Sequence, residues 1–125
     1  MNGQPHVRLS TVVLGAPDPR TLAAFYQQIL RWPIGADEDD WVTLRDPDSP
    51  VSLGFQREEG HVRPAWPAGS GEQQMQVHLD LEVDDLDEAI GFARSLGAVL
   101  AEYQPQDDVR VLLDPAGHPF CVWVR

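Results

Sequence analysis

The sequence predicts an α+β fold in which two tandem βαβββ modules form a curved, half-barrel mixed sheet with the helices outside. The main observation is an internal repeat, since the second half of the chain follows the first at a spacing of about 67 residues. The matching segments are residues 11–18 with 78–85, Phe25 with Phe92, and Asp46-Pro47 with Asp114-Pro115. Because one module of about 50 residues is too small to bury a large core, we expect a single domain over residues 1–125.

The first module is expected over about residues 7–57. Residues 7–14 alternate and include β-branched side chains, which is typical of a strand. Asp18 can cap a helix and Pro19 is favoured at a first helical position, so a helix should run from Pro19 to Arg31. Three shorter strands are expected at residues 33–36, 41–45 and 51–56.

Residues 58–75 are expected to be a linker, because they are rich in Gly and Pro and lack a hydrophobic period. Trp66 lies in this linker between Pro64 and Pro67. A tryptophan in a loop either packs as a plug or covers a binding cleft as a lid.

The second module is expected over about residues 76–125 and repeats the order of the first. Its helix should span residues 86–96, with Asp84 or Asp85 as the cap and Gly97 as the closing glycine. The expected strands are residues 76–83, 99–103, 109–113 and 120–124.

Strand alternation predicts which side chains line a cleft between the modules, because successive residues point to opposite faces. In the strand over 76–83, the odd-numbered side chains should face the core and leave His78, Asp80 and Glu82 on the other face. Cys121 and Trp123 share the corresponding face of the last strand. The first module adds Thr11, Val13, Ser52, Gly54 and Gln56.

The tryptophans are expected to serve two purposes, packing of the first module's core and recognition of a ligand. Trp32 and Trp41 are expected to close the core of the first module, whereas the parity of Trp123 places it in the cleft. An indole ring there could stack on a cationic or planar ligand, with Asp80 and Glu82 adding attraction for a cation.

The composition limits the classes of partner. The net charge of -11 repels nucleic acid and anionic lipid, so we expect neither as a partner. Cys121 is the single cysteine, which excludes an intrachain disulfide and fits a reducing compartment. The chain starts without an apolar signal region and contains no run long enough to span a membrane, so we expect a cytoplasmic protein.

The repeat, together with Leu96-Gly97-Ala98 and Asp114-Pro-Ala-Gly-His-Pro-Phe-Cys121, resembles the vicinal oxygen chelate superfamily. Its members include glyoxalase I, extradiol dioxygenases, and bleomycin or fosfomycin resistance proteins. The segments Phe55-Gln56, Pro64-Ala-Trp-Pro67 and His78-Leu-Asp-Leu81 are similar to glyoxalase-like proteins. The resemblance covers nearly the whole chain and implies a homodimer, but it does not fix an activity, because the superfamily hosts several chemistries.

The resemblance also implies where a metal would bind. Relatives that use a metal take four ligands, mostly His and Glu, from the opening and closing strand of each module. The equivalent positions here are Thr11, Ser52, His78 and Cys121, of which only His78 keeps the usual ligand type. Neutral hydroxyls are poor ligands for zinc or iron, so we expect no metal cofactor. A divalent metal held by His78 and Cys121, completed by Asp80, Glu82 or a substrate, remains the alternative.

Two functions from different classes therefore remain open. The first is a non-enzymatic protein that binds a small molecule, cationic or aromatic, in the cleft, with the usual metal site degenerate. Its ligand-binding residues would be Thr11, Ser52, Gln56, His78, Asp80, Cys121, Trp123 and Trp66. The second is a glyoxalase-like lyase, isomerase or dioxygenase with His78 as the catalytic residue and a nonstandard metal or none. A nucleophilic Cys121 with His78 as its base is a further reading.

Overall fold

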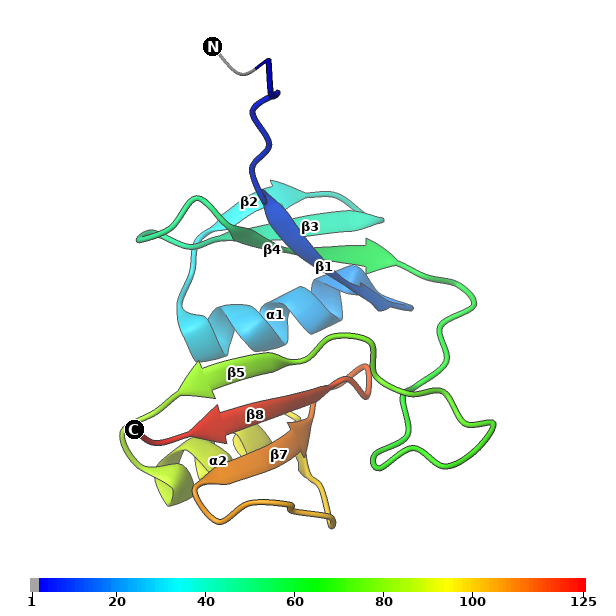
Figure 1. The fold of residues 1–125 in the computed structure, drawn as a ribbon, viewed down its shortest axis with the longest axis vertical. Coiled ribbons are helices and arrows are strands. Elements are labelled where there is room, and N and C mark those ends of the chain that lie inside the picture. The colour runs from blue at the N-terminus through cyan, green and yellow to red at the C-terminus, as the bar shows by residue number, and fades with distance from the viewer. Residues whose placement is uncertain (1–2) are drawn as a thin grey trace.

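Each half of the chain forms an open, four-stranded mixed sheet with one helix packed against it (Figure 1). The computed structural model describes residues 3–125. The strand order is β1-β4-β3-β2 in the first sheet and β5-β8-β7-β6 in the second. The elements are β1 (Thr11–Ala16), α1 (Pro19–Leu30), β2 (Ile34–Asp37), β3 (Trp41–Arg45), β4 (Ser52–Arg57), β5 (Leu79–Glu82), α2 (Leu86–Ser95), β6 (Val99–Leu100), β7 (Val109–Leu113) and β8 (Pro119–Trp123).

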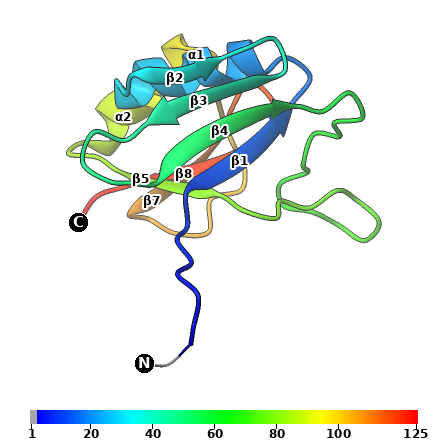
Figure 2. The same cartoon turned by 90° about the horizontal axis from the view of Figure 1, so that it is seen from above.

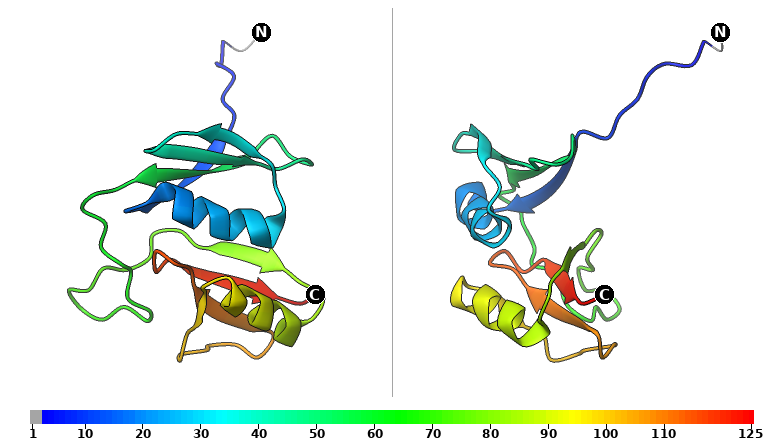
Figure 3. Two further views of the ribbon diagram at one scale, coloured as in Figure 1. Left: turned by 180° about the vertical axis from the view of Figure 1, so that it is seen from behind. Right: turned by 90° about the vertical axis from the view of Figure 1, so that its left-hand side faces the viewer.

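The identical order of the two halves confirms the α+β class and the tandem βαβββ modules. In each module the opening strand pairs in parallel with the closing strand, which pairs antiparallel with the strand before it. Both helices lie on the same side of the two sheets (Figure 3). Figure 2 shows the same arrangement from above, with α1 and α2 on one side of the molecule and β1, β4, β5 and β8 on the other.

Local capping sets the helix boundaries. The Asp18 carboxylate accepts from the Arg20 backbone N–H at 3.1 Å, and Pro19 follows it as predicted. Helix α1 ends because Arg31 adopts the left-handed conformation, with φ at 59°. Of the two candidate caps for α2, the structure selects Asp85, whose carboxylate accepts from the Glu88 N–H at 2.9 Å.

The two modules share one core, which fixes how the sheets sit relative to each other. Phe25 and Tyr26 of α1 contact Phe120 of β8 with ring centroids 5.7 and 5.9 Å apart, and Tyr26 stacks on Phe55 of β4. The Tyr26 hydroxyl donates a 2.7 Å hydrogen bond to Asp114, which is buried in the last turn of the second module. Burial raises the pKa of Asp114 above its ordinary value.

Three predicted strands are shorter than expected, although Ser10, Val83 and Ala101 each keep one backbone hydrogen bond to the neighbouring strand. Strand β1 begins at Thr11 because residues 3–10 extend away from the sheet, leaving Val7 86% exposed (Figure 1). Strand β5 begins at Leu79, so His78 precedes it and Val77 is exposed rather than in the core. Strand β6 ends at Leu100 because the Gln104 side-chain amide bonds the Val111 backbone in place of a continuing strand.

The prediction for Trp41 is wrong, whereas that for Trp32 is confirmed. Trp32 packs against the core cluster. Trp41 alternates with the buried Val42 and Leu44 and therefore lies on the opposite face of β3. Its ring covers Gly54, where an added Cβ would meet the ring at 2.5 Å.

Within residues 3–125, no helix combines the length and apolar character needed to cross a lipid bilayer.

Candidate functional site

Three side chains that could bind a metal ion or take part in a reaction lie close together on the second sheet. Strands β5 and β8 pair in parallel with Asp80 opposite Cys121, and His78 directly precedes β5 on the same face. The His78 Nε2 and Asp80 Oδ1 atoms are 3.1 Å apart. One ligand atom from each of His78, Asp80 and Cys121 lies within 4.8 Å of the others. Strand register therefore creates this group from residues that are far apart in the sequence.

The thiol of Cys121 is not activated by this environment. Burial, with the Asp80 carboxylate as the second cause, raises its pKa to about 11. At neutral pH the group is a protonated thiol, which is a weak nucleophile. The arrangement is thus unlike a Cys–His nucleophile pair, in which the thiol pKa is depressed.

A small apolar pocket of about 170 Å³ adjoins His78 and Cys121. Its floor includes Val109 and Val111 of β7, which the strand register places on the same face as Cys121. Its other walls come from the linker and the loop before β7, namely Trp66, Met75, Pro105 and Gln106, with Pro119 at the start of β8. The pocket is therefore a mostly apolar cavity in which His78 forms one polar corner and Gln106 adds a second polar side chain.

The linker covers part of the second sheet. The Trp66 Nε1–H donates to the Tyr103 carbonyl at 3.2 Å, and the two rings are 6.0 Å apart. These contacts hold the half-buried indole at the rim of the pocket. Trp66 is thus packed in place and also lines the cavity.

The donor set of the group fits a metal ion of zinc type. Imidazole nitrogen, carboxylate oxygen and thiolate sulfur are the ligands that zinc takes in proteins, and three protein ligands are usual for a catalytic site. His78, Asp80 and Cys121 would hold the ion, and a bound cation would lower the pKa of the Cys121 thiol. Such an ion would supply Lewis acidity beside the pocket.

The first-module positions equivalent to metal ligands lie in another part of the molecule. Thr11 and Ser52 pair with each other across β1 and β4. They line a separate open groove together with Thr43 and Arg45, and the Thr11 hydroxyl lies 3.2 Å from that of Ser10. The structure therefore does not bring all four implied ligand positions into one pocket.

The remaining predicted residues are engaged with their own chain. The Gln56 side-chain amide donates to Glu58 at 2.8 Å. Arg125 lies over the Trp123 ring at 5.3 Å and pairs with Glu82 at 2.7 Å, which holds the pKa of Glu82 below its ordinary value. The aromatic and acidic pair expected to attract a cationic ligand thus already contacts an internal cation, which leaves Asp80 as the acidic group next to His78.

Sequence reasoning missed several walls of the pocket. Val109 and Val111 could have been found, because their parity in β7 matches that of Cys121 in the neighbouring strand. Met75 and Pro105 lie outside regular strands, so no periodic signal marks them.

Comparison with known proteins gives a consistent family assignment. A family model described as the glyoxalase-like domain matches residues 11–123. Among curated proteins, none matches this sequence significantly.

Solved structures share the fold at low sequence identity. A glyoxalase/bleomycin resistance protein/dioxygenase family enzyme from Burkholderia phytofirmans PsJN is 21% identical, with a TM-score of 0.70 over 94% of this chain and 98% of that one. A lactoylglutathione lyase from Agrobacterium tumefaciens is 18% identical, with a TM-score of 0.61 over 97% and 96%. TnmS3, an antibiotic binding protein from Streptomyces sp. CB03234, is 15% identical, with a TM-score of 0.60 over 97% and 98%. The fold thus occurs in both enzymes and binding proteins.

Proposed function

This chain belongs to the glyoxalase-like domain family, and on that premise we propose that it binds a small organic molecule in the pocket beside His78 and Cys121. The observation that carries the proposal is the convergence of three separate segments on one cavity. Trp66 comes from the linker, His78 from the approach to β5, and Cys121 from β8.

The walls indicate the chemistry of the ligand. Val109, Val111 and Pro119 offer apolar contact, and Trp66 offers an aromatic ring. His78 offers a polar side chain, and its Nε2 lies 3.1 Å from Oδ1 of Asp80, which is not itself a lining residue. An aromatic group that carries one amine would satisfy both parts, because the ring fills the apolar side and the amine hydrogen-bonds the imidazole. At about 170 Å³ the pocket would enclose the recognised end of such a ligand rather than the whole of a drug-sized molecule.

Binding to this pocket can be followed by fluorescence. Because Trp66 lines the cavity, a panel of aromatic amines and cationic glycopeptides should quench or shift its emission. A Trp66→Phe variant keeps an aromatic wall and should lose the signal that arises in the pocket. If no compound of the panel binds the wild-type chain in titration calorimetry, the proposal fails.

A histidine pair provides the matched control. We expect His78→Ala to weaken binding of a responsive amine by about tenfold, because the polar corner loses its imidazole. His6→Ala changes the same residue type in the exposed N-terminal segment and should leave affinity unchanged. Equal effects of the two substitutions would contradict a role for the corner.

The clustering of His78, Asp80 and Cys121 supports a second candidate, a metal-dependent enzyme of the glyoxalase-like kind. Cobalt(II) is a suitable probe, since thiolate coordination gives an intense charge-transfer band. A stoichiometric band that Cys121→Ser abolishes would support this candidate. Weak, non-saturating uptake that is equal in wild type and in Cys121→Ser would exclude it.

A further inference from the structure

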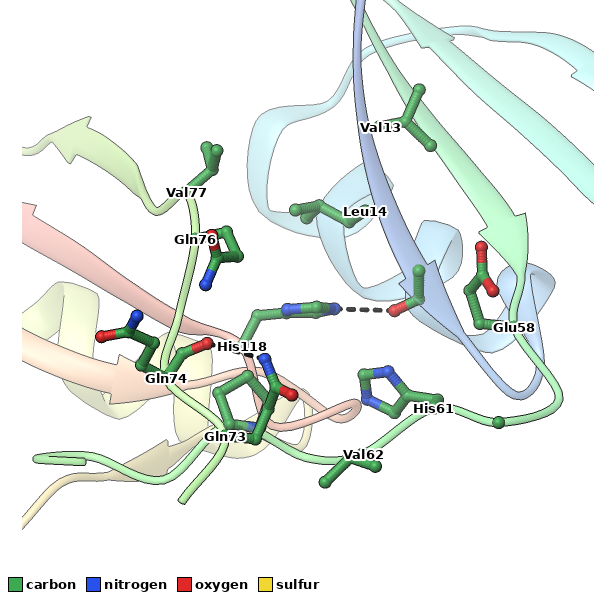
Figure 4. A pocket seen from close by; sticks show the side chains of 13 residues that line it. Val13, Leu14, Glu58, His61, Val62, Gln73, Gln74, Gln76, Val77 and His118 are labelled. Carbon is green, nitrogen blue, oxygen red and sulfur yellow. Dashed lines mark hydrogen bonds between the residues drawn. The ribbon is translucent and has the colours of Figure 1, made fainter. Parts of the chain in front are cut away.

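A second cavity, of about 380 Å³, lies where the two modules meet (Figure 4). It is bounded by β1, by both ends of the linker, and by His118 from the last turn of the second module. None of the described residues that line the pocket beside Cys121 also lines this cavity. Its volume falls in the range of small-molecule sites, which is about 300 to 1,000 Å³.

Two imidazoles are fixed in this cavity by backbone hydrogen bonds. The His118 Nε2–H donates to the Gly15 carbonyl and the His61 Nε2–H to the Ala116 carbonyl, both at 2.7 Å. A carbonyl oxygen can only accept, so Nε2 carries the hydrogen in both rings. In a ring that carries this one hydrogen, the Nδ1 atom is a hydrogen-bond acceptor. The ring centroids are 5.2 Å apart, and Figure 4 shows both side chains pointing into the cavity from different segments.

The Glu58 carboxylate lies at the same cavity, because the Glu58 side chain packs closely against β1. The Glu58 side chain crosses over Gly15, where an added Cβ would lie 2.6 Å from the Glu58 Cγ. Glu58 Oε1 accepts from the Gln56 amide at 2.8 Å, which leaves Oε2 to accept from a ligand. Among the described lining residues there is no Lys or Arg to neutralise this charge.

The rest of the wall completes a site for a hydrogen-bond donor. Amide side chains of Gln73, Gln74 and Gln76 line one side, and Val13, Val62 and Val77 provide apolar contact. The Glu58 carboxylate and the two imidazoles therefore present mainly hydrogen-bond acceptors to the cavity. The net charge of -11 on the chain also attracts cations. We propose that this junction cavity is a second binding site, which takes a small organic cation with several N–H donors on a flat group, of amidinium or guanidinium type.

The first experiment compares two ligands of nearly equal shape. Benzamidine is cationic, whereas benzamide is neutral. Titration followed by ¹⁵N-resolved NMR should give saturable benzamidine shifts at the amide side chains of Gln73, Gln74 and Gln76, with benzamide at least about tenfold weaker. Benzamidine shifts that do not saturate, or equal affinity for both compounds, would overturn the proposal.

The second experiment uses neighbouring carboxylates. Glu58→Gln removes the charge but keeps an oxygen for the Gln56 hydrogen bond, and we expect it to weaken benzamidine binding by about tenfold. Glu59→Gln makes the same charge change at an exposed residue outside the cavity and should leave affinity unchanged. If both variants lost the same amount of benzamidine affinity, the loss would come from the change in net charge, and the proposed site would be refuted.

The two sites can be distinguished by one variant. Benzamidine affinity at the junction should be the same in wild type and in His78→Ala, because His78 does not line this cavity. Loss of the NMR shifts in His78→Ala would mean that the cation binds in the pocket beside Cys121. That result would overturn the junction site and leave the proposed function intact.

Discussion

Replacement of Asp80 by Asn tests the electrostatics of the second-module group. In the native chain, burial is the largest cause of the raised pKa of Cys121, and the Asp80 charge and its hydrogen bond to the thiol are the other two. Asp80→Asn removes the charge but not the burial. The pKa of the thiol should therefore fall from about 11 part of the way toward the ordinary value of 9.0.

These two pKa values of the Cys121 thiol limit the expected change in its alkylation rate. A fall of about one pKa unit raises the thiolate fraction at pH 8 about tenfold. A less basic thiolate is also less nucleophilic, which offsets nearly half of that gain on a logarithmic scale. The alkylation rate at pH 8 should thus rise by about three- to fourfold, while the midpoint of the pH–rate profile shifts by the full unit.

The assay is alkylation of Cys121, the single cysteine, by iodoacetamide, followed by intact mass between pH 7 and pH 10.5. The wild-type rate should rise about tenfold per pH unit through pH 10, and Asp80→Asn should level off earlier. Glu82→Gln is the control, because Glu82 lies two residues along β5 but pairs with Arg125. A wild-type midpoint near pH 9, or identical profiles for wild type and Asp80→Asn, would refute the reasoning.

Three further predictions concern the shared core and the first sheet. Tyr26→Phe should lower the free energy of unfolding by about 1 to 3 kcal/mol in urea, because a buried oxygen of Asp114 loses its donor. Since burial raises the pKa of Asp114, the unfolded chain loses this proton first, so stability falls as pH rises above 3.8; the stability of wild type minus that of Asp114→Asn should decrease toward neutral pH. Gly54→Ala should cost about 1 to 3 kcal/mol through its clash with Trp41, whereas Gly60→Ala meets no atom within 4 Å and should be neutral.

Each of these predictions has a clear contrary result. Unchanged urea midpoints in Tyr26→Phe would mean that the hydroxyl does not stabilise Asp114. A stability difference for Asp114→Asn that is constant with pH would mean that the carboxyl has an ordinary pKa. Equal stability of Gly54→Ala and Gly60→Ala would mean that the Trp41 ring moves aside without cost.

The candidate site was partly accessible from the sequence because strand alternation is a local property. Parity alone put His78, Asp80 and Cys121 on one face, and the parallel register of β5 and β8 then brought them together. The same reasoning applied to Trp41 would have placed it on the exposed face, since Val42 and Leu44 are the apolar neighbours that define the core side.

The sequence by itself determined the features that depend on neighbours in the chain: the repeated βαβββ order, the Asp18 cap of the first helix, and the face of each strand on which a side chain lies. Only the tertiary structure decided which of those faces meet. It separated Thr11 and Ser52 from His78 and Cys121, and it placed Arg125 on Trp123. The reason is physical, because periodicity and capping act over a few residues, whereas the relative placement of modules, linker and chain end follows from contacts between residues far apart in sequence.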